Sequence, residues 1–400
     1  MTLPLIIRRS LRQHAFSTTI TALAIALAGG LLMSVWVVKE QSQKTFTQVN
    51  TGFDAVLGAR SSKLQLVLNA IFHLEASPGN VALADYEFIR KHPAVKLAIP
   101  IAVGDNLRGF RIVGTVPDLF TEVEYTAGKK FVLTSGKIFD PAEKEAVLGS
   151  FAAQQLGLKA GDEFHPFHGL AFDERNQHAD TFRVAGVLAP SNTPADKVVW
   201  IPLHGLQTMA GHDPRVATDV SAVLIQLRSP AAGFMLDMMY NKQGNRLTFA
   251  FPIGAIMAEL FQKIGWFNQV LTLVAYLVAL VSAAGVLAAI YNSMAARRRD
   301  IAILRALGAG RGLLFGAIVI ESAVIGALGM LAAFGIYVMI VSAVAVVIRA
   351  QTGVMIETFA YNPVMLWAPP GMIGLCALCG LLPAWKAYRT DVAENLSPVS

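Results

Sequence analysis

Four long stretches of the chain are apolar along nearly their whole length, and the sequence between them is mixed. They cover residues 16–38, 266–294, 313–348 and 364–385, and Glu321 is their only charged residue. A helix needs about 20 mostly apolar residues to cross a bilayer. The pattern therefore predicts an α-helical membrane protein with four transmembrane helices, one before and three after a large intervening domain.

In the intervening segment, residues 39–265, the apolar runs are short and separated by polar and turn-forming residues, as in a folded domain. Apolar runs bounded by Gly, Pro and Asn predict strands, and longer runs without such breaks predict helices. The tripeptide Gly104-Asp105-Asn106 is a turn signal between the first two strands. We expect strands at 95–103, 109–116, 182–188, 198–202 and 222–227, and helices at 64–72, 85–91 and 150–156. The sequence thus predicts a mixed α+β domain.

Basic residues cluster beside particular ends of the apolar stretches. Lys and Arg near membrane spans favour the cytoplasmic side. The clusters contain Arg8, Arg9 and Arg12 before the first stretch, Arg297, Arg298, Arg299, Arg305 and Arg311 between the second and third, and Lys386 and Arg389 after the fourth. Segments 1–15, 295–312 and 386–400 are therefore expected in the cytoplasm. The domain at 39–265 and the short loop at 349–363 are expected outside the inner membrane, in the periplasm of a bacterium with two membranes.

The first apolar stretch has a second interpretation as a cleaved signal peptide. Ala26-Leu27-Ala28 resembles a small-residue cleavage site. The sequence stays apolar as far as Val38, whereas a cleaved signal normally gives way to polar residues. This continuation favours a retained helix.

Composition agrees with a membrane protein. Hydrophobic residues make up 54% of the chain and charged residues 15%, compared with about 25% charged in soluble domains. Residues 39–263 contain equal numbers of basic and acidic side chains, so the net charge of +6 comes from the flanks of the apolar stretches. This distribution argues against a nucleic-acid-binding domain. Cys376 and Cys379 both lie in the last apolar stretch, where we interpret them as small helix residues rather than a redox pair.

One motif resembles a known family. Residues 297–309 read Arg-Arg-Arg-Asp-Ile-Ala-Ile-Leu-Arg-Ala-Leu-Gly-Ala, which is similar to the signature of FtsX-type ABC permeases, the family that includes the MacB and lipoprotein-releasing (LolC/LolE) branches. Glu321-Ser322, Pro383-Ala384 and the stretches 146–149 and 157–162 resemble the family elsewhere. The resemblance covers most of the chain. It implies a type VII, mechanotransmission-class permease with a MacB-like periplasmic core domain at 39–265.

The resemblance also implies that residues 295–312 form the helix that couples the permease to its ATPase. Ile301, Leu304 and Gly308 would share one helix face that seats in a groove of a partner. The complete predicted coupling set is Arg297, Arg298, Arg299, Asp300, Ile301, Leu304, Arg305, Leu307 and Gly308. A basic flank without a partner is the alternative; it explains the arginines but not the ordered apolar positions.

The chain contains no Gly-x-x-x-x-Gly-Lys-Ser/Thr phosphate loop. We therefore expect no enzyme activity or cofactor in this chain, with ATP and Mg bound by two copies of a separate ATPase. The resemblance implies pairing with a second copy or a sister permease, and a cargo that is a lipoprotein, lipid or hydrophobic molecule. It leaves open a periplasmic or outer-membrane partner. Two alternatives are a complex that regulates a periplasmic enzyme or senses a ligand, and an anchored metal-binding protein without an ATPase.

Two further kinds of residue stand out inside the predicted membrane stretches. Glu321 is expected to face the bundle or the cytoplasmic interface, because a carboxylate in lipid is unfavourable by a few kcal/mol. Small residues permit close helix contact, and the candidates are Gly29, Gly30, Gly326 and Gly329.

Three histidines lie close together in the domain. His165, His168 and His178, with acidic residues nearby, are candidate ligands for zinc or a similar ion. A solvated polar loop is the competing interpretation. No motif of a hydrolase or metalloprotease accompanies them.

Overall fold

The computed structural model describes residues 3–48, 52–209, 218–296 and 309–389, which divide into two compact units. The helical unit contains the described residues up to Gln41, Ile264–Ala345 and those from Glu357 onward. The sheet domain contains the described residues of Ser42–Lys263 together with Val346–Ile356.

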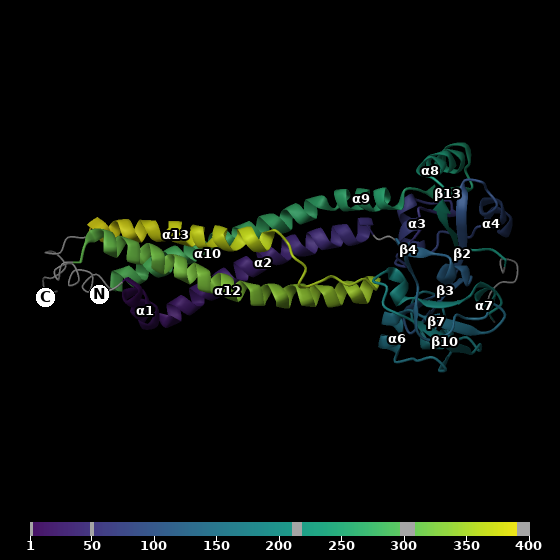
Figure 1. Cartoon of the computed structure of the whole chain (residues 1–400), viewed down its shortest axis with the longest axis horizontal. Helices are drawn as coiled ribbons and strands as arrows, with labels where there is room; N and C mark the ends of the chain where they lie inside the picture. The colour runs from purple at the N-terminus through teal and green to yellow at the C-terminus, as the bar shows by residue number, and fades with distance from the viewer. Residues whose placement is uncertain (1–2, 49–51, 210–217, 297–308, 390–400) are drawn as a thin grey trace. The chain divides into compact units, whose positions relative to one another are not determined.

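The helical unit contains four helices that are long and apolar enough to cross a membrane. They are α2 (Ala15–Gln48), α10 (Gly265–Ala296), α12 (Arg311–Thr352) and α13 (Val364–Arg389), and the short helix α1 (Leu3–Gln13) precedes them (Figure 1). Each of the four predicted apolar stretches falls within one of these helices, and each helix extends beyond it. α13 continues through Pro369, Pro370 and Pro383.

Polar contacts at one end of the helical unit join three helices and the loop before α13. The side chain of Asn362 donates to Oε2 of Glu40 over 2.8 Å, and the hydroxyl of Tyr337 donates to the carbonyl of Thr358 over 2.7 Å. Trp36 of α2 meets Trp367 of α13 edge to face, with ring centroids 5.8 Å apart. These contacts join α2, α12, α13 and the loop before α13.

A mixed sheet forms the centre of the other unit. Its strands run in the order β13-β1-β12-β2-β3-β11-β7-β10-β6, with β8 paired to β10 and β9 to β2. Two pairings are parallel, β3 with β11 and β7 with β10. The strands are β1 (Ala55–Ala59), β2 (Val95–Leu107), β3 (Phe110–Thr115), β6 (Leu133–Gly136), β7 (Glu145–Leu148), β8 (Glu163–Phe164), β9 (Phe167–His168), β10 (Phe182–Leu188), β11 (Val199–Pro202), β12 (Ala222–Leu227) and β13 (Leu247–Ala250). The mixed α+β domain predicted from the pattern of strands and helices is thus confirmed.

Short helices and one ribbon complete the domain. The α-helices are α3 (Lys63–Ala70), α4 (Leu83–Arg90), α5 (Asp118–Thr121), α6 (Ser150–Leu156), α7 (Leu203–Gln207), α8 (Pro230–Asp237) and α9 (Ile253–Lys263). The remaining elements are the ribbon of β4 (Glu124–Thr126) and β5 (Lys129–Lys130), the 3₁₀ turns η1 (Glu174–Asn176) and η2 (Pro194–Lys197), and the π-turn η4 (Met238–Gln243). Ser62 caps α3 by accepting from the N–H of Gln65, and Gly157 ends α6 with a left-handed φ of 70°.

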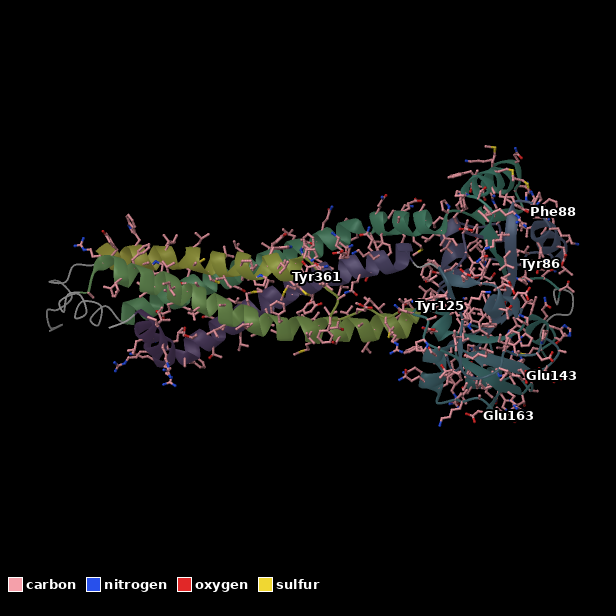
Figure 2. The ribbon with its side chains drawn as sticks, viewed as in Figure 1. Tyr86, Phe88, Tyr125, Glu143, Glu163 and Tyr361 are labelled. Carbon is pink, nitrogen blue, oxygen red and sulfur yellow. The ribbon has the colours of Figure 1, made fainter. Side chains whose placement is uncertain are left out.

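The sheet has a hydrophobic core on both faces. Along β1, Val56 packs into one cluster while Ala55 and Leu57 pack into another, because successive side chains of a strand point to opposite faces. Helices cover these clusters. In α4 the ring of Tyr86 is buried and that of Phe88 is exposed (Figure 2).

The predicted turn at Gly104-Asp105-Asn106 is wrong. β2 continues to Leu107, with an irregular register between Val103 and Asp105. The chain reverses at Arg108 and Gly109, whose φ values of 49° and 88° are those of a tight two-residue hairpin. A bulge accommodates glycine and short polar residues within a strand as readily as a turn does, so the local signal was ambiguous.

The last part of α12 and the first residues after it, Val346–Ile356, belong to the sheet domain. They include the start of the short loop expected at 349–363. The guanidinium of Arg349 lies 5.0 Å from the ring centre of Phe151. Lys197 donates to the carbonyl of Gln351 over 2.8 Å, and the N–H of Met355 donates to Oδ1 of Asn192 over 2.6 Å. These contacts dock residues 346–356 on the η2 region.

One histidine makes the stability of the sheet domain depend on pH. Burial, aided by the charge of Arg111, lowers the pKa of His73 from 6.5 to about 3. As pH falls below 6.5, the unfolded chain therefore binds a proton that the folded chain does not. The free energy of unfolding should decrease by up to about 1.4 kcal/mol per pH unit between 6.5 and 3.

This pH effect is measured by denaturant unfolding of the domain at pH 7, 6, 5 and 4. The rings of His73 and Trp200 meet edge to face with their centroids 5.7 Å apart. His73→Phe should keep this ring contact and flatten the dependence of the unfolding free energy on pH. His204→Phe, at an exposed position, is the matched control and should keep it. If His73→Phe shows the same dependence of unfolding free energy on pH as the wild type, His73 is not the group responsible for it.

Candidate functional site

Glu321 contacts the short N-terminal helix. The hydroxyl of Ser10 in α1 donates a hydrogen bond to Oε1 of Glu321 in α12. Ser10 is buried and Glu321 half-buried. Because hydrogen bonding compensates a carboxylate for lost hydration, the pair ties α1 to the first part of α12, inside its apolar stretch.

The predicted packing glycines lie at close helix crossings. A Cβ on Gly29 would lie 2.6 Å from Sδ of Met330, and one on Gly329 would lie 2.6 Å from Cβ of Ile25. Gly30 meets Ile336 in the same way. α2 and α12 therefore approach each other so closely that side chains at these positions would clash.

A second crossing joins α12 to α13. A Cβ on Gly326 would lie 3.0 Å from Cβ of Cys376, and a Cβ on Gly380 would collide with the hydroxyl of Ser322. Cys376 is buried in this crossing, in agreement with its interpretation as a small packing residue. Sequence reasoning missed Gly380, although it belongs to the same class of small residues in an apolar helix.

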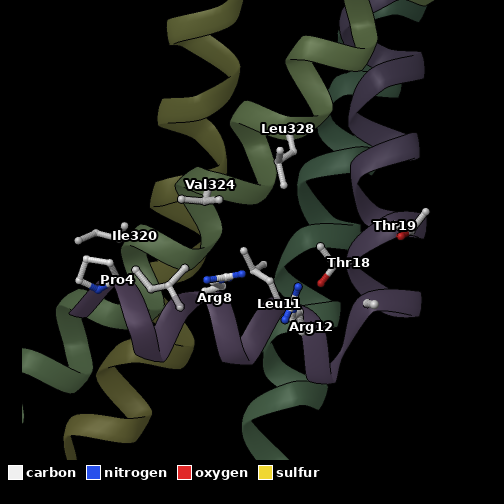
Figure 3. Close-up of a pocket in the computed structure, with 11 residues that line it drawn as sticks. Pro4, Arg8, Leu11, Arg12, Thr18, Thr19, Ile320, Val324 and Leu328 are labelled. Atoms are coloured by element: carbon white, nitrogen blue, oxygen red, sulfur yellow. The ribbon is translucent and has the colours of Figure 1, made fainter. Parts of the chain in front are cut away.

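An open groove of about 590 Å³ lies between α1, the start of α2 and α12. Ile320, Val324 and Leu328 of α12 form its apolar wall, and Arg8 and Arg12 enter it from α1 (Figure 3). Apolar surface beside two cations suits the acyl chain and anionic headgroup of a lipid.

The predicted coupling residues lie outside the described part of the chain. Arg297, Arg298, Arg299, Asp300, Ile301, Leu304, Arg305, Leu307 and Gly308 all fall in the interval 297–308. Their role therefore remains a prediction from the sequence motif.

The structure brings together two of the three candidate histidines and adds a carboxylate. Nδ1 of His168 lies 3.2 Å and Nε2 of His178 lies 3.3 Å from Oδ1 of Asp105. His165 lies apart, with its Nδ1 3.2 Å from the carbonyl oxygen of Asp180. Sequence reasoning missed Asp105 because it placed this residue in a turn, whereas β2 carries it to a position opposite His168 of β9.

Comparisons with known proteins identify two matching families. The model of the MacB-like periplasmic core domain matches residues 18–233, more than half of the chain, and that of the FtsX-like permease C-terminal region matches residues 272–392. A search of curated proteins gives no significant match. The assignment rests on the two family models.

Two solved structures are similar to part of the chain. The extracellular domain of the noncanonic ABC-type transporter YknZ from Gram-positive bacteria is 16% identical, over 48% of this chain and 97% of that one, with a TM-score of 0.30. The periplasmic region of MacB from Actinobacillus actinomycetemcomitans is 11% identical, over 54% of this chain and 94% of that one, with a TM-score of 0.35.

Proposed function

Because this chain belongs to the family of FtsX-like ABC transporter permeases with a MacB-like periplasmic core domain, we propose that it is the membrane subunit of a transporter whose ATPase is a separate protein. Two ATPase copies, which bind ATP and Mg, would act on two permeases, either two copies of this chain or this chain and a sister. The permeases would lie in a bacterial inner membrane with both termini in the cytoplasm. The family match is the observation that carries this proposal.

We infer that the 297–308 motif receives the ATPase stroke and that α12 carries it outward. Two observations support this path. The motif ends directly before α12, and α12 runs as one helix from Arg311 to Thr352. Its last residues belong to the sheet domain. A stiff helix with one end at the motif and the other docked on the domain is suited to mechanical transmission.

The proposed cargo is a lipoprotein, lipid or hydrophobic molecule handled at the outer side of the membrane. The four candidate spans are poor material for a hydrophilic channel, because Glu321 is the only charged residue of the four apolar stretches. The groove beside Arg8 and Arg12 further suggests that membrane lipid contacts the cytoplasmic end of the bundle. An alternative is a regulatory complex in which the domain controls a periplasmic enzyme or senses a ligand without transport.

The proposal is tested by co-expressing the chain with the ABC ATPase encoded beside it and measuring ATP hydrolysis in nanodiscs. Changing both Ile301 and Leu304 to Asp should abolish assembly or reduce stimulated hydrolysis at least ~10-fold, since two buried apolar contacts of about 1.5–3 kcal/mol each would be lost. Changing Ala302 and Ala306 to Asp is the matched control, because it adds the same charges on the other face of the predicted helix.

The result distinguishes the proposals clearly. If the wild-type chain binds no ATPase, the permease assignment fails. If both double variants lose activity equally, the predicted apolar face is not the contact. An active complex that binds a periplasmic hydrolase and moves no lipid or lipoprotein would favour the regulatory alternative.

A further inference from the structure

Three side chains from separate segments of the sheet domain converge at one place. Asp105 comes from β2, His168 from β9 and His178 from the segment after η1. One nitrogen of each imidazole and a carboxylate oxygen all lie within 4.8 Å of one another. Both imidazole nitrogens face the same carboxylate oxygen, at 3.2 and 3.3 Å.

The two nitrogen–oxygen separations are close to those between ligands of a tetrahedral metal ion. Imidazole nitrogens bind Zn²⁺ at about 2.0–2.1 Å and carboxylate oxygens at about 2.0–2.2 Å, which places two tetrahedral ligands roughly 3.3–3.5 Å apart. Two imidazoles and one carboxylate are also a common ligand set for catalytic zinc and for other divalent transition metals. The carboxylate oxygen thus lies near ligand distance from both imidazole nitrogens, and all three donors lie within 4.8 Å of one another.

The backbone around the three ligands is held in place by neighbouring hydrogen bonds. Asn106, the residue after Asp105, donates to the carbonyls of Gly169 over 2.8 Å and Ala171 over 3.2 Å, and accepts from the N–H of Gly109. The N–H of His178 donates to the carbonyl of Pro166 over 2.9 Å. Asn106 thus ties the loop after His168 to the β2–β3 hairpin, and pre-organised ligands lower the entropic cost of binding.

Burial differs among the ligands in a way that favours an accessible ion. The Asp105 side chain is fully buried and that of His178 is 5% exposed, whereas that of His168 is 57% exposed. The buried carboxylate supplies the negative charge that attracts a cation. The exposed imidazole leaves a route from solvent and room for a water or other ligand.

We propose that Asp105, His168 and His178 bind one divalent transition-metal ion of the zinc class, with a coordination position open to solvent. The open position makes the site exchangeable, unlike a closed four-ligand structural site. This site goes beyond the proposed permease function and does not depend on it. A set of His–Asp hydrogen bonds is the competing explanation of the same distances, and it predicts no metal affinity.

The test is a titration of the full chain in nanodiscs, after removal of any polyhistidine tag, with Zn²⁺ followed by calorimetry and Co²⁺ followed by visible absorption. We expect one ion per chain and a tetrahedral Co²⁺ spectrum. His168→Gln, at the exposed ligand, should weaken binding by at least ~10-fold, since even outer-shell changes cost 10–100-fold. His165→Gln is the matched control and should bind as the wild type does.

Asp105→Asn adds a second variant that retains the size and an oxygen acceptor at the buried position. It should also weaken binding at least ~10-fold, because the amide supplies no negative charge. Wild-type affinity in both His168→Gln and Asp105→Asn would overturn the proposal, as would the absence of saturable Zn²⁺ binding by the wild-type chain. Melting curves without metal identify any variant that fails to fold. ATPase stimulation is measured separately, so failure of the metal site leaves the permease proposal intact.

Discussion

Replacing Gly329 by Leu is expected to separate α12 from α2. A Cβ at this position would lie 2.6 Å from Cβ of Ile25 and 3.0 Å from the carbonyl oxygen of Ala22. The second contact is with backbone, which a side-chain rotation cannot relieve. Overpacking typically costs about 1–3 kcal/mol, and we expect the upper end here, which corresponds to a ~100-fold larger population of opened bundles.

Thiol labelling of Cys376 measures this opening. Cys376 is buried one crossing away, against Gly326, and in a Cys379→Ser background it is the only cysteine of the chain. Its labelling by a maleimide should accelerate at least ~10-fold in Gly329→Leu. Gly335→Leu is the matched control on the same helix, because nothing lies within 4 Å of its Cβ position. Equal labelling rates in the two variants would contradict the close crossing.

The helices could be predicted from sequence because their signal is local and strong. A run of 20 or more apolar residues needs no tertiary information to be recognised. The packing glycines were predictable for a related reason, since small residues in such a run have few roles other than close contact. Which helix each glycine meets was not predictable. The pairing of Gly329 with Ile25, or of Gly380 with Ser322, depends on how the helices assemble.

The candidate metal cluster shows where local reasoning fails. His168 and His178 were found by their type and proximity in sequence, but Asp105 lies 63 residues before His168 along the chain. Only the β2–β9 pairing brings them together, by placing Asp105 opposite His168. His165 is also a histidine and lies only three residues before His168 in sequence. Its ring nitrogen nevertheless lies near the carbonyl oxygen of Asp180 rather than Asp105.

The docking of residues 346–356 was also beyond the sequence pattern. The apolar run ends at Ile348, so hydrophobicity alone predicted a membrane exit followed by a short loop. The contacts of Arg349, Gln351 and Met355 are with residues 151, 197 and 192. Such contacts form one by one between distant segments and leave no periodic trace in either segment.

Replacing Gly353 by Val is expected to release this docked segment from the sheet domain. Gly353 has a φ of 77°, and a Cβ there would lie 3.0 Å from Cβ of Lys197 and 3.3 Å from its backbone nitrogen. A side chain in the left-handed region costs about 1–2 kcal/mol, a β-branched one more, and the contact with backbone adds to it. Amide hydrogen exchange at 346–356 should accelerate by about 10–100-fold, corresponding to 1.4–2.8 kcal/mol.

Gly128→Val separates the loss of docking from backbone strain alone. Gly128 has a similar φ of 73°, but nothing lies within 4 Å of its Cβ position, so the variant should leave exchange at 346–356 unchanged. If α12 transmits the ATPase stroke, Gly353→Val should retain ATP hydrolysis and lose the work done by the domain, because the motor and the domain stay intact while their connection loosens. Simultaneous loss of both activities would mean that α12 is needed for assembly, and retention of both would mean that the stroke reaches the domain through another helix.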